Sequence, residues 1–305
     1  MFQSISDQNN SKIYWIASYP RSGNTFVRIL LSNYIISKDK SIQINEIYNF
    51  IPADTKSKLW DRVTPDLWKK AAQEQKWLWR ASLIEEYRKQ GLTRPFPGMK
   101  THTINLPVFN QPAFSFSPAD RIVYIVRHPL DVLMSYADYN GRDLDKAISI
   151  MSASGTCIDS DTPGGFEPRG SWREHVASWL NCTDCPVLLV RYEDLCDRTE
   201  TTLRDVLTFL DIPIDEERLR RAISFSAFSS LQQQEAEDGF RERPDVTLSG
   251  KFFREGRSRQ WLKALSPERA YRLADHCGDV MTKLGYTHPR DVYFDGRNAY
   301  GPVKF

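Results

Sequence analysis

The sequence predicts an α/β fold, in which a doubly wound parallel sheet is flanked by helices. Three apolar segments rich in β-branched and aromatic residues support this prediction, namely IYWIAS (13–18), RIVYIV (121–126) and VLLVRY (187–192). Runs of this kind are typical of strands that are buried on both faces, as in a parallel sheet. A helical pattern follows each of them, and repeated strand–helix units favour a parallel sheet covered by helices.

The expected helices follow their strands after short turns. They span residues 24–37, 129–139 and about 199–210, where the sequence DIPID ends the third helix. Ligands of doubly wound sheets bind beyond the carboxyl ends of the strands. The three turns after the strands are therefore expected to meet at one site.

Less regular segments lie between these units. Residues 45–98 contain four tryptophans among charged residues and are expected to form short helices and loops, while residues 152–170 are a loop rich in Gly, Pro and Ser. Residues 232–260 are polar. Because the candidate sites extend from residue 20 to residue 261, we expect a single domain over 1–305, with a flexible N-terminus over 1–10.

Composition and charge are those of an ordinary globular protein, with 41% hydrophobic and 26% charged residues. The net charge of +2 implies no attraction to nucleic acid or to a membrane surface. The first residues lack the pattern of a secretory signal, and no stretch approaches the ~18 apolar residues of a membrane span. The five cysteines are an odd number for a disulfide framework. We therefore expect a cytoplasmic protein with no membrane span and no nucleic-acid partner.

The turn after the first strand, SYPRSGNTF (18–26), has the outline of a phosphate-binding loop. A loop between a strand and a helix directs free backbone N–H groups to one point, with the helix dipole behind them. Gly23 permits a close approach of the backbone to a ligand, and Arg21 supplies a positive charge. Further donors come from the side chains of Ser22, Asn24 and Thr25. The loop is P-loop-like but lacks the lysine and the first glycine of G-x-x-x-x-G-K-[ST]. By itself it is equally compatible with an ordinary βα turn.

A second anion-competent turn follows the second strand. Arg127 ends that strand, and Ser135 lies about two turns into the helix that begins near Pro129. Arg127 and Ser135 are expected to meet around a second anionic group. Two such turns at one sheet edge suit a ligand with two separated phosphate-like groups.

With these segments, the sequence resembles the sulfotransferases that use 3′-phosphoadenosine 5′-phosphosulfate (PAPS), particularly the soluble cytosolic type. The resemblance extends over nearly the whole chain, because the family's motifs occur in the family's order. They are YPRSGNTF (19–26), KTH (Lys100, Thr101, His102), VYIVRHPLDVLMSY around Arg127 and Ser135, GSWREHVASW (170–179), YED (Tyr192, Glu193, Asp194) and FFREGRSRQW (252–261). Each motif alone is weak evidence, whereas the ordered set is strong.

The resemblance implies how the nucleotide binds. Arg21 and the segment from Ser22 to Thr25, which includes Gly23 and Asn24, would bind the 5′-phosphosulfate. The adenine would lie against Phe26, Tyr192 and Phe228. The 3′-phosphate would be held by Arg127, Ser135, Arg254 and Gly256.

The resemblance also implies the chemistry. His102 matches the catalytic base, Lys100 a residue that steadies the transferring sulfuryl group, and Arg21 the basic residue that stabilises the leaving phosphate. The co-substrate would be PAPS and the product 3′-phosphoadenosine 5′-phosphate (PAP), with no metal required. The acceptor would be the hydroxyl, or amine, of a small molecule.

Three departures from the family pattern stand out. Glu255 replaces a lysine next to the expected 3′-phosphate site, Asn24 replaces a threonine, and Phe26 replaces the usual tryptophan. The short dimerisation element of some relatives is not evident after Trp261. The chain is therefore expected to be either a monomer or a homodimer.

Two alternatives to a sulfotransferase stay open at this point, a P-loop nucleotide kinase and a non-catalytic nucleotide-binding relative. The missing G-K-[ST] speaks against the kinase, whereas Glu255 is compatible with a non-catalytic relative. The acceptor is expected to contact residues 45–98, 140–170 and 229–249. The aromatic residues of the first segment suggest an apolar or aromatic acceptor, but its tryptophans could equally be core anchors.

Overall fold

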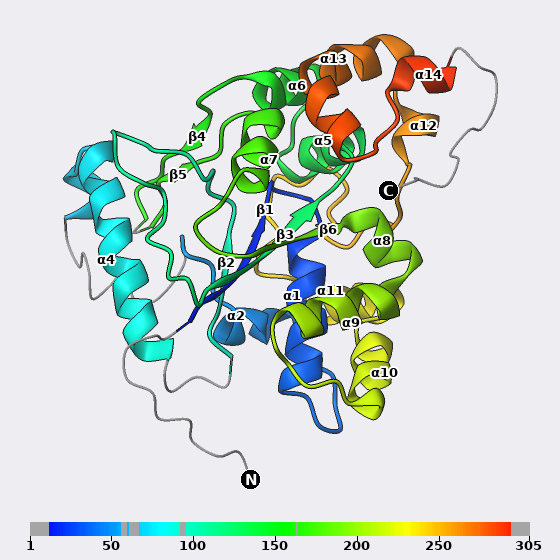
Figure 1. Ribbon diagram of the computed structural model, residues 1–305. Helices are drawn as coiled ribbons and strands as arrows, with labels where there is room; N and C mark the ends of the chain where they lie inside the picture. Colours follow the sequence, from blue (N-terminus) through cyan, green and yellow to red (C-terminus); the bar gives the residue numbers. More distant parts are fainter. Residues whose placement is uncertain (1–11, 56–59, 61–66, 92–95, 163, 294–305) are drawn as a thin grey trace.

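A four-stranded parallel sheet lies at the centre of the molecule (Figure 1). The computed structural model describes residues 12–55, 60, 67–91, 96–162 and 164–293. The strands run in the order β2-β1-β3-β6, with bounds β1 Tyr14–Ser18, β2 Gly98–Thr101, β3 Arg121–Val126 and β6 Val187–Arg191. Ile16 of β1 is in register with Lys100 on one side and with Val123 on the other. The predicted parallel α/β sheet is confirmed.

Helices cover both faces of this sheet. One face carries α1 (Asn24–Ile35), α9 (Thr199–Phe209) and α10 (Glu216–Phe225). The other carries α4 (Gln73–Gly91), α5 (Pro129–Tyr139), α6 (Leu144–Ser152), α7 (Trp172–Leu180), α12 (Trp261–Ala264) and α13 (Pro267–Lys283). Four further α-helices lie in the described ranges, namely α2 (Ile47–Phe50), α8 (Tyr192–Asp197), α11 (Phe228–Asp238) and α14 (Pro289–Tyr293). The three helices expected from the sequence are α1, α5 and α9.

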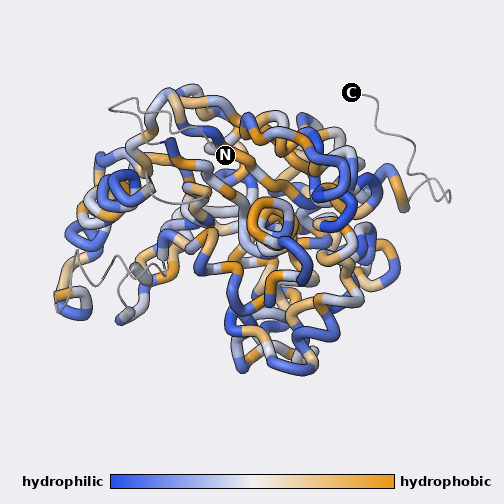
Figure 2. The backbone as a smooth tube through the Cα atoms, turned by 90° about the horizontal axis from the view of Figure 1, so that it is seen from below, coloured by the Kyte–Doolittle hydropathy of each residue, from blue (hydrophilic) through white to orange (hydrophobic). Residues whose placement is uncertain are grey.

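The sheet has a hydrophobic core on each side, because successive side chains of a strand point to opposite faces. Trp15 and Ala17 of β1 belong to the core under α5 and α7, whereas Tyr14 and Ile16 belong to the core under α1. Figure 2 shows the hydrophobic stretches gathered toward the middle of the molecule. The prediction of burial on both faces holds for β1 and β3. It is wrong for β6, which is an edge strand with Leu189 37% exposed.

The segment 45–98 differs from its expectation in two respects. It contains the long helix α4, and its end begins the strand β2. The sequence of β2, GMKT, has neither the length nor the β-branched composition of a predictable strand, and it is ordered by pairing with β1. The segment 152–170 also contains a small antiparallel pair, β4 (Cys157–Ile158) with β5 (Glu167–Pro168).

The tryptophans of this segment are core anchors. Trp60, Trp68 and Trp77 are at most 3% exposed, and the rings of Trp60 and Trp68 meet edge to face at 5.0 Å. Trp79 is partly buried against the same core. None of the four lines the cavity described below.

Two expectations about the whole chain stay predictions. Residues 1–10, expected to be flexible, lie outside the described residues, and a single domain over 1–305 is untested. Among the helices in the described ranges, none is both long enough and apolar enough to cross a bilayer.

Candidate active site

A cavity of about 660 Å³ lies at the carboxyl ends of the strands. Each strand contributes through the turn that follows it: Arg21 follows β1, His102 follows β2, Arg127 follows β3 and Tyr192 follows β6. The turns meet as the parallel sheet predicts. The predicted residues that line the cavity are Arg21, Gly23, Asn24, Thr25, Phe26, Lys100, His102, Arg127, Ser135, Tyr192, Phe228, Arg254 and Gly256.

Ser22 is the predicted residue that does not line the cavity. Its side chain is fully buried, and its Oγ has no hydrogen-bond partner in the described part of the chain. The turn around it is sharply wound, because Arg21 (φ 68°) and Gly23 (φ 104°) both adopt left-handed conformations. Such a conformation is costly for a residue with a Cβ, so its presence at Arg21 marks a strained turn at the cavity.

Asn24 uses its amide differently from the expectation that it faces a ligand. Its Nδ2 donates to the carbonyl of Ile16 at 2.8 Å and contacts Ser18 Oγ at 3.3 Å. The side chain therefore ties the start of α1 to the end of β1. Its Oδ1 has no partner among the described residues.

The guanidinium of Arg21 is held on all sides. Its Nε donates to Ser135 Oγ at 3.0 Å and its Nη2 to the carbonyl of Phe252 at 3.2 Å. It also lies over the rings of Tyr139, at 4.5 Å, and Phe252, at 4.2 Å. Burial lowers the pKa of Arg21 to about 10. The group is therefore still cationic at neutral pH.

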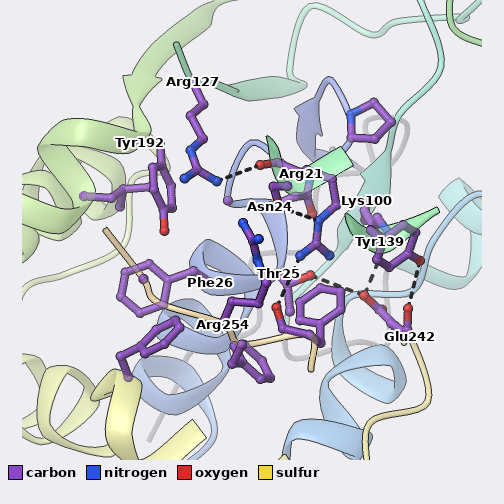
Figure 3. A pocket seen from close by; sticks show the side chains of 18 of the residues that line it. Arg21, Asn24, Thr25, Phe26, Lys100, Arg127, Tyr139, Tyr192, Glu242 and Arg254 are labelled. Carbon is purple, nitrogen blue, oxygen red and sulfur yellow. Dashed lines mark hydrogen bonds and ion pairs between the residues drawn. The ribbon is translucent and has the colours of Figure 1, made fainter. Parts of the chain in front are cut away.

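Arg127 lies beside Arg21 and lines the same cavity as Ser135, although Ser135 bonds Arg21 directly. The Nη atoms of Arg127 donate to the carbonyls of Arg21, at 3.3 Å, and Arg257, at 3.1 Å. The guanidinium covers the ring of Tyr192 at 4.2 Å, and Nε has no partner in the described part. Figure 3 shows Arg21, Arg127 and Arg254 directed toward one space bordered by Phe26 and Tyr192.

Helix α11 positions the segment that carries Arg254, an arrangement not anticipated from the sequence. Glu235 accepts from the backbone N–H groups of Phe252, at 2.6 Å, and Phe253, at 2.9 Å. Gln232 Nε2 donates to the carbonyls of Phe253 and Arg254 at 3.0 and 2.8 Å. The cavity wall at Arg254 is thus anchored by polar side chains of the preceding helix, 17 to 22 positions earlier in the chain.

The same segment continues through Glu255 and Gly256. Gly256 (φ 61°) packs so closely on Phe228 that a Cβ there would lie 2.4 Å from a ring carbon. Glu255 is exposed but still borders the cavity. Arg254 forms a loose ion pair with Asp138 at 3.8 Å.

His102 has a defined tautomer. Its Nδ1 lies 2.7 Å from the carbonyl of Ser18, an atom that can only accept, so Nδ1 carries the proton and Nε2 is free to accept one. Burial, and then the neighbouring charge of Lys100, lower the pKa of His102 well below its usual 6.5. The ring is therefore neutral at neutral pH, the form that a general base requires.

Glu242 occupies the site between the loop and Lys100, and sequence reasoning missed it. Its carboxylate bonds Arg28 Nη1 at 2.7 Å, accepts from Thr25 Oγ1 at 3.3 Å and lies 3.9 Å from Lys100 Nζ. Burial raises the pKa of Glu242, but Arg28 and Lys100 outweigh burial and the net shift is downward. An ionised carboxylate thus lies where two of the predicted ligand-binding side chains converge (Figure 3).

A second charged pair lines the cavity, within the segment 140–170 that was expected to contact the acceptor. Glu167 Oε1 accepts from Arg169 Nε at 2.7 Å, and both residues border the cavity together with His102. No motif in the sequence marked either residue as part of a site.

Two histidines outside the cavity have structural roles. His128 caps the start of α5, where its ring accepts from the N–H of Leu130. His175 is buried in α7 and bonds the hydroxyl of Tyr124 at 2.9 Å. Neither lines the cavity.

The cavity fits an anionic nucleotide. Several arginines line it, among them Arg21, Arg127 and Arg254, whose guanidinium groups face one space (Figure 3). Two buried polar atoms of residues that line the cavity have no hydrogen-bond partner within the described ranges, namely Asn24 Oδ1 and Arg127 Nε. Buried polar atoms normally have partners, so this concentration of unsatisfied atoms indicates a polar ligand.

Known proteins resemble this chain over most of its length. The sulfotransferase domain family matches residues 12–285. Cytosolic sulfotransferase 15 of Arabidopsis thaliana is 27% identical over 207 residues, which cover 65% of this chain and 55% of the relative. Sulfotransferase 2B1 of Mus musculus is 24% identical over 259 residues, which cover 81% of this chain and 64% of the relative. The chain thus spans less than two thirds of the length of these relatives.

Two solved structures share the fold. Mouse sulfotransferase SULT7A1 complexed with PAP has a TM-score of 0.57 and 16% identity, covering 90% of this chain and 86% of that one. Retinol dehydratase in complex with androsterone and the inactive cofactor PAP has a TM-score of 0.57 and 16% identity, covering 96% and 83%.

Proposed function

The chain belongs to the sulfotransferase family, and from this premise we propose that it transfers a sulfuryl group from PAPS to a hydroxyl or amine of a small molecule. The observation that carries the proposal is the convergence of a neutral histidine, His102, and the cationic Arg21 on one cavity at the carboxyl ends of the strands. The PAP bound to both solved relatives supports the choice of nucleotide. A cytoplasmic location and a monomeric or homodimeric state belong to the same proposal.

The nucleotide would be bound by residues that follow β1, β3 and β6, together with Phe228 and the segment around Arg254. The backbone N–H groups of the Ser22–Thr25 turn and Arg21 would hold the 5′-phosphosulfate. Phe26, Tyr192 and Phe228 would enclose the adenine. Arg127, Ser135, Arg254 and Gly256 would hold the 3′-phosphate. Because Ser135 bonds Arg21 directly, it would contribute to both ends of the nucleotide site.

The chemistry divides between the co-substrate and the chain. PAPS supplies, when bound, a sulfuryl group attached to a phosphate leaving group. His102 accepts the acceptor's proton at Nε2, since Nδ1 is already committed to the carbonyl of Ser18. Arg21 stabilises negative charge on the leaving oxygen electrostatically, because a guanidinium remains charged at neutral pH. Its hydrogen bonds to Ser135 and Phe252 fix the position of the guanidinium before the nucleotide binds. Lys100 would assist the transferring group, and no metal is expected to be required.

Ligand binding separates this proposal from its alternatives. Isothermal titration should show that PAP binds without added metal and that ATP with Mg²⁺ binds at least tenfold more weakly. A preference for ATP with Mg²⁺ would favour the P-loop kinase. Binding of PAP without any transfer of label from ³⁵S-PAPS to a broad acceptor panel would favour the non-catalytic relative.

A further inference from the structure

We propose that the acceptor is a neutral polyhydroxylated molecule, such as a glycoside, whose hydroxyl groups are bound by Glu167 and Arg169. This inference rests on the proposed sulfotransferase function and names the class of acceptor. It differs from the expectation of an apolar or aromatic acceptor, whose basis was the aromatic residues of segment 45–98. Of these, Tyr48 lines the cavity, but the tryptophans do not. Those tryptophans lie in the core instead.

Glu167 and Arg169 have polar atoms that remain available for hydrogen bonds to a ligand in the cavity. Only Nε of Arg169 and Oε1 of Glu167 bond each other, at 2.7 Å. Within the described residues, the structure shows no hydrogen bond for Glu167 Oε2 or for the Nη groups of Arg169. Yet Glu167 is only 7% exposed, and both residues border the cavity. One carboxylate oxygen and two guanidinium nitrogens are therefore available to a ligand.

The pair is also held rigidly next to His102. Strand β5, which carries Glu167, pairs with β4, and the carbonyl of Thr156 accepts from the N–H of Arg169 at 2.8 Å. The N–H of Ile104, two residues after His102, donates to the carbonyl of Pro168 at 2.9 Å. A molecule bound to the pair would thus be fixed relative to the histidine. Such positioning is what in-line transfer requires.

The charges of the pair favour a neutral partner. Burial raises the pKa of Glu167, but the neighbouring positive charges, above all that of Arg169, outweigh burial and lower that pKa to about 2. Both members are therefore ionised near neutral pH, and their charges cancel. A charged acceptor would gain little from such a pair, whereas a hydroxyl can donate to the carboxylate and accept from the guanidinium.

An apolar ring placed on the pair would be disfavoured. It would remove the free oxygen and nitrogens from water without replacing their hydrogen bonds, and such losses typically cost roughly 1–3 kcal/mol for each group. Vicinal hydroxyl groups satisfy both side chains at once. The same principle lets a site built for hydroxyl binding reject analogues that lack the hydroxyl.

The test uses the full chain loaded with PAP and matched ligands. Isothermal titration would compare phenyl β-glucoside, phenyl β-galactoside and myo-inositol with 4-propylphenol, an aromatic hydroxyl compound without a polyol. The variants are Glu167→Gln, which keeps the side-chain volume, and Arg169→Leu. Glu217→Gln, an exposed residue on α10, is the matched control. Transfer of label from ³⁵S-PAPS to the same compounds is the second readout.

We expect at least one polyol to bind and to become labelled, in preference to 4-propylphenol. Glu167→Gln should weaken polyol binding about tenfold or more, leaving PAP affinity and 4-propylphenol binding unchanged, while Glu217→Gln has no effect. The inference would be overturned if 4-propylphenol bound more tightly than the polyols or if no polyol bound. It would also be overturned if polyol affinity were the same in Glu167→Gln as in the unaltered chain. Failure of PAP itself to bind would instead count against the proposed function.

Discussion

The substitution Gly23→Ala tests how the first turn builds the nucleotide site. Gly23 has φ 104°, and a Cβ there would lie 2.5 Å from Cδ2 of Tyr192. The ring cannot simply move away, because Arg127 covers it at 4.2 Å and Tyr192 is buried. The left-handed conformation costs about 1–2 kcal/mol for a residue with a Cβ, and overpacking costs about 1–3 kcal/mol. Gly23→Ala should therefore lower the free energy of unfolding by about 2–5 kcal/mol.

Gly155→Ala is the matched control for backbone strain. Gly155 also has a left-handed φ, 64°, but a Cβ there meets nothing within 4 Å. Only the conformational cost of about 1–2 kcal/mol should appear in this variant. The difference between the two variants isolates the contact with Tyr192.

Urea unfolding and isothermal titration with PAP measure the two consequences. Displacement of Tyr192 should also disturb Arg127, so Gly23→Ala should weaken PAP binding at least tenfold, whereas Gly155→Ala should bind like the unaltered chain. The reasoning is refuted if Gly23→Ala is no less stable than Gly155→Ala and retains full PAP affinity.

Three further predictions concern His102 and Glu242. His102→Gln should reduce transfer by about 10²–10⁴-fold with PAP affinity unchanged, and near-normal turnover would exclude this histidine as the base. Because the pKa of His102 is depressed, the neutral base persists as pH falls through 6.5. The value of kcat/KM should therefore start to fall on the acid side only well below pH 6.5, and an acid limb centred at pH 6.5 or above would contradict the depressed pKa. Glu242→Gln removes a charge-assisted bond to the fully buried Arg28, which keeps two bonds to the carbonyl of Ile51. We expect a loss of about 1–3 kcal/mol in urea unfolding together with tighter PAP binding, since a negative charge beside Lys100 is removed. Weaker PAP binding in Glu242→Gln would show that the carboxylate supports the nucleotide site.

Segments whose structure depends on local pattern were predictable from the sequence. The apolar runs of β1 and β3, the helix starts at Asn24 and Pro129, and the turns that carry Arg21 and Arg127 follow from side-chain composition and spacing. Parallel strands then bring the turns together at one sheet edge, so the cavity's location also follows.

Other features of the site required tertiary structure. The strand β2, which delivers Lys100 and His102, is ordered by pairing with β1 and has no strand pattern of its own. The hydrogen bond between Arg21 and Ser135 depends on how the turn after β1 packs against α5. Neither segment determines that packing by itself.

By itself, the sequence determined the parallel sheet, the turn from Arg21 to Phe26 and the family to which the chain belongs. Only the tertiary structure decided what surrounds that turn. Glu242 meets Arg28 across 214 positions of the chain, and Glu167 reaches the cavity of His102 through the pairing of β5 and the contact of Pro168 with Ile104. Charged residues in polar loops show no hydrophobic periodicity from which their burial could be predicted. Their role is decided by which distant backbone segments pack together, and that depends on the free energy of the whole fold.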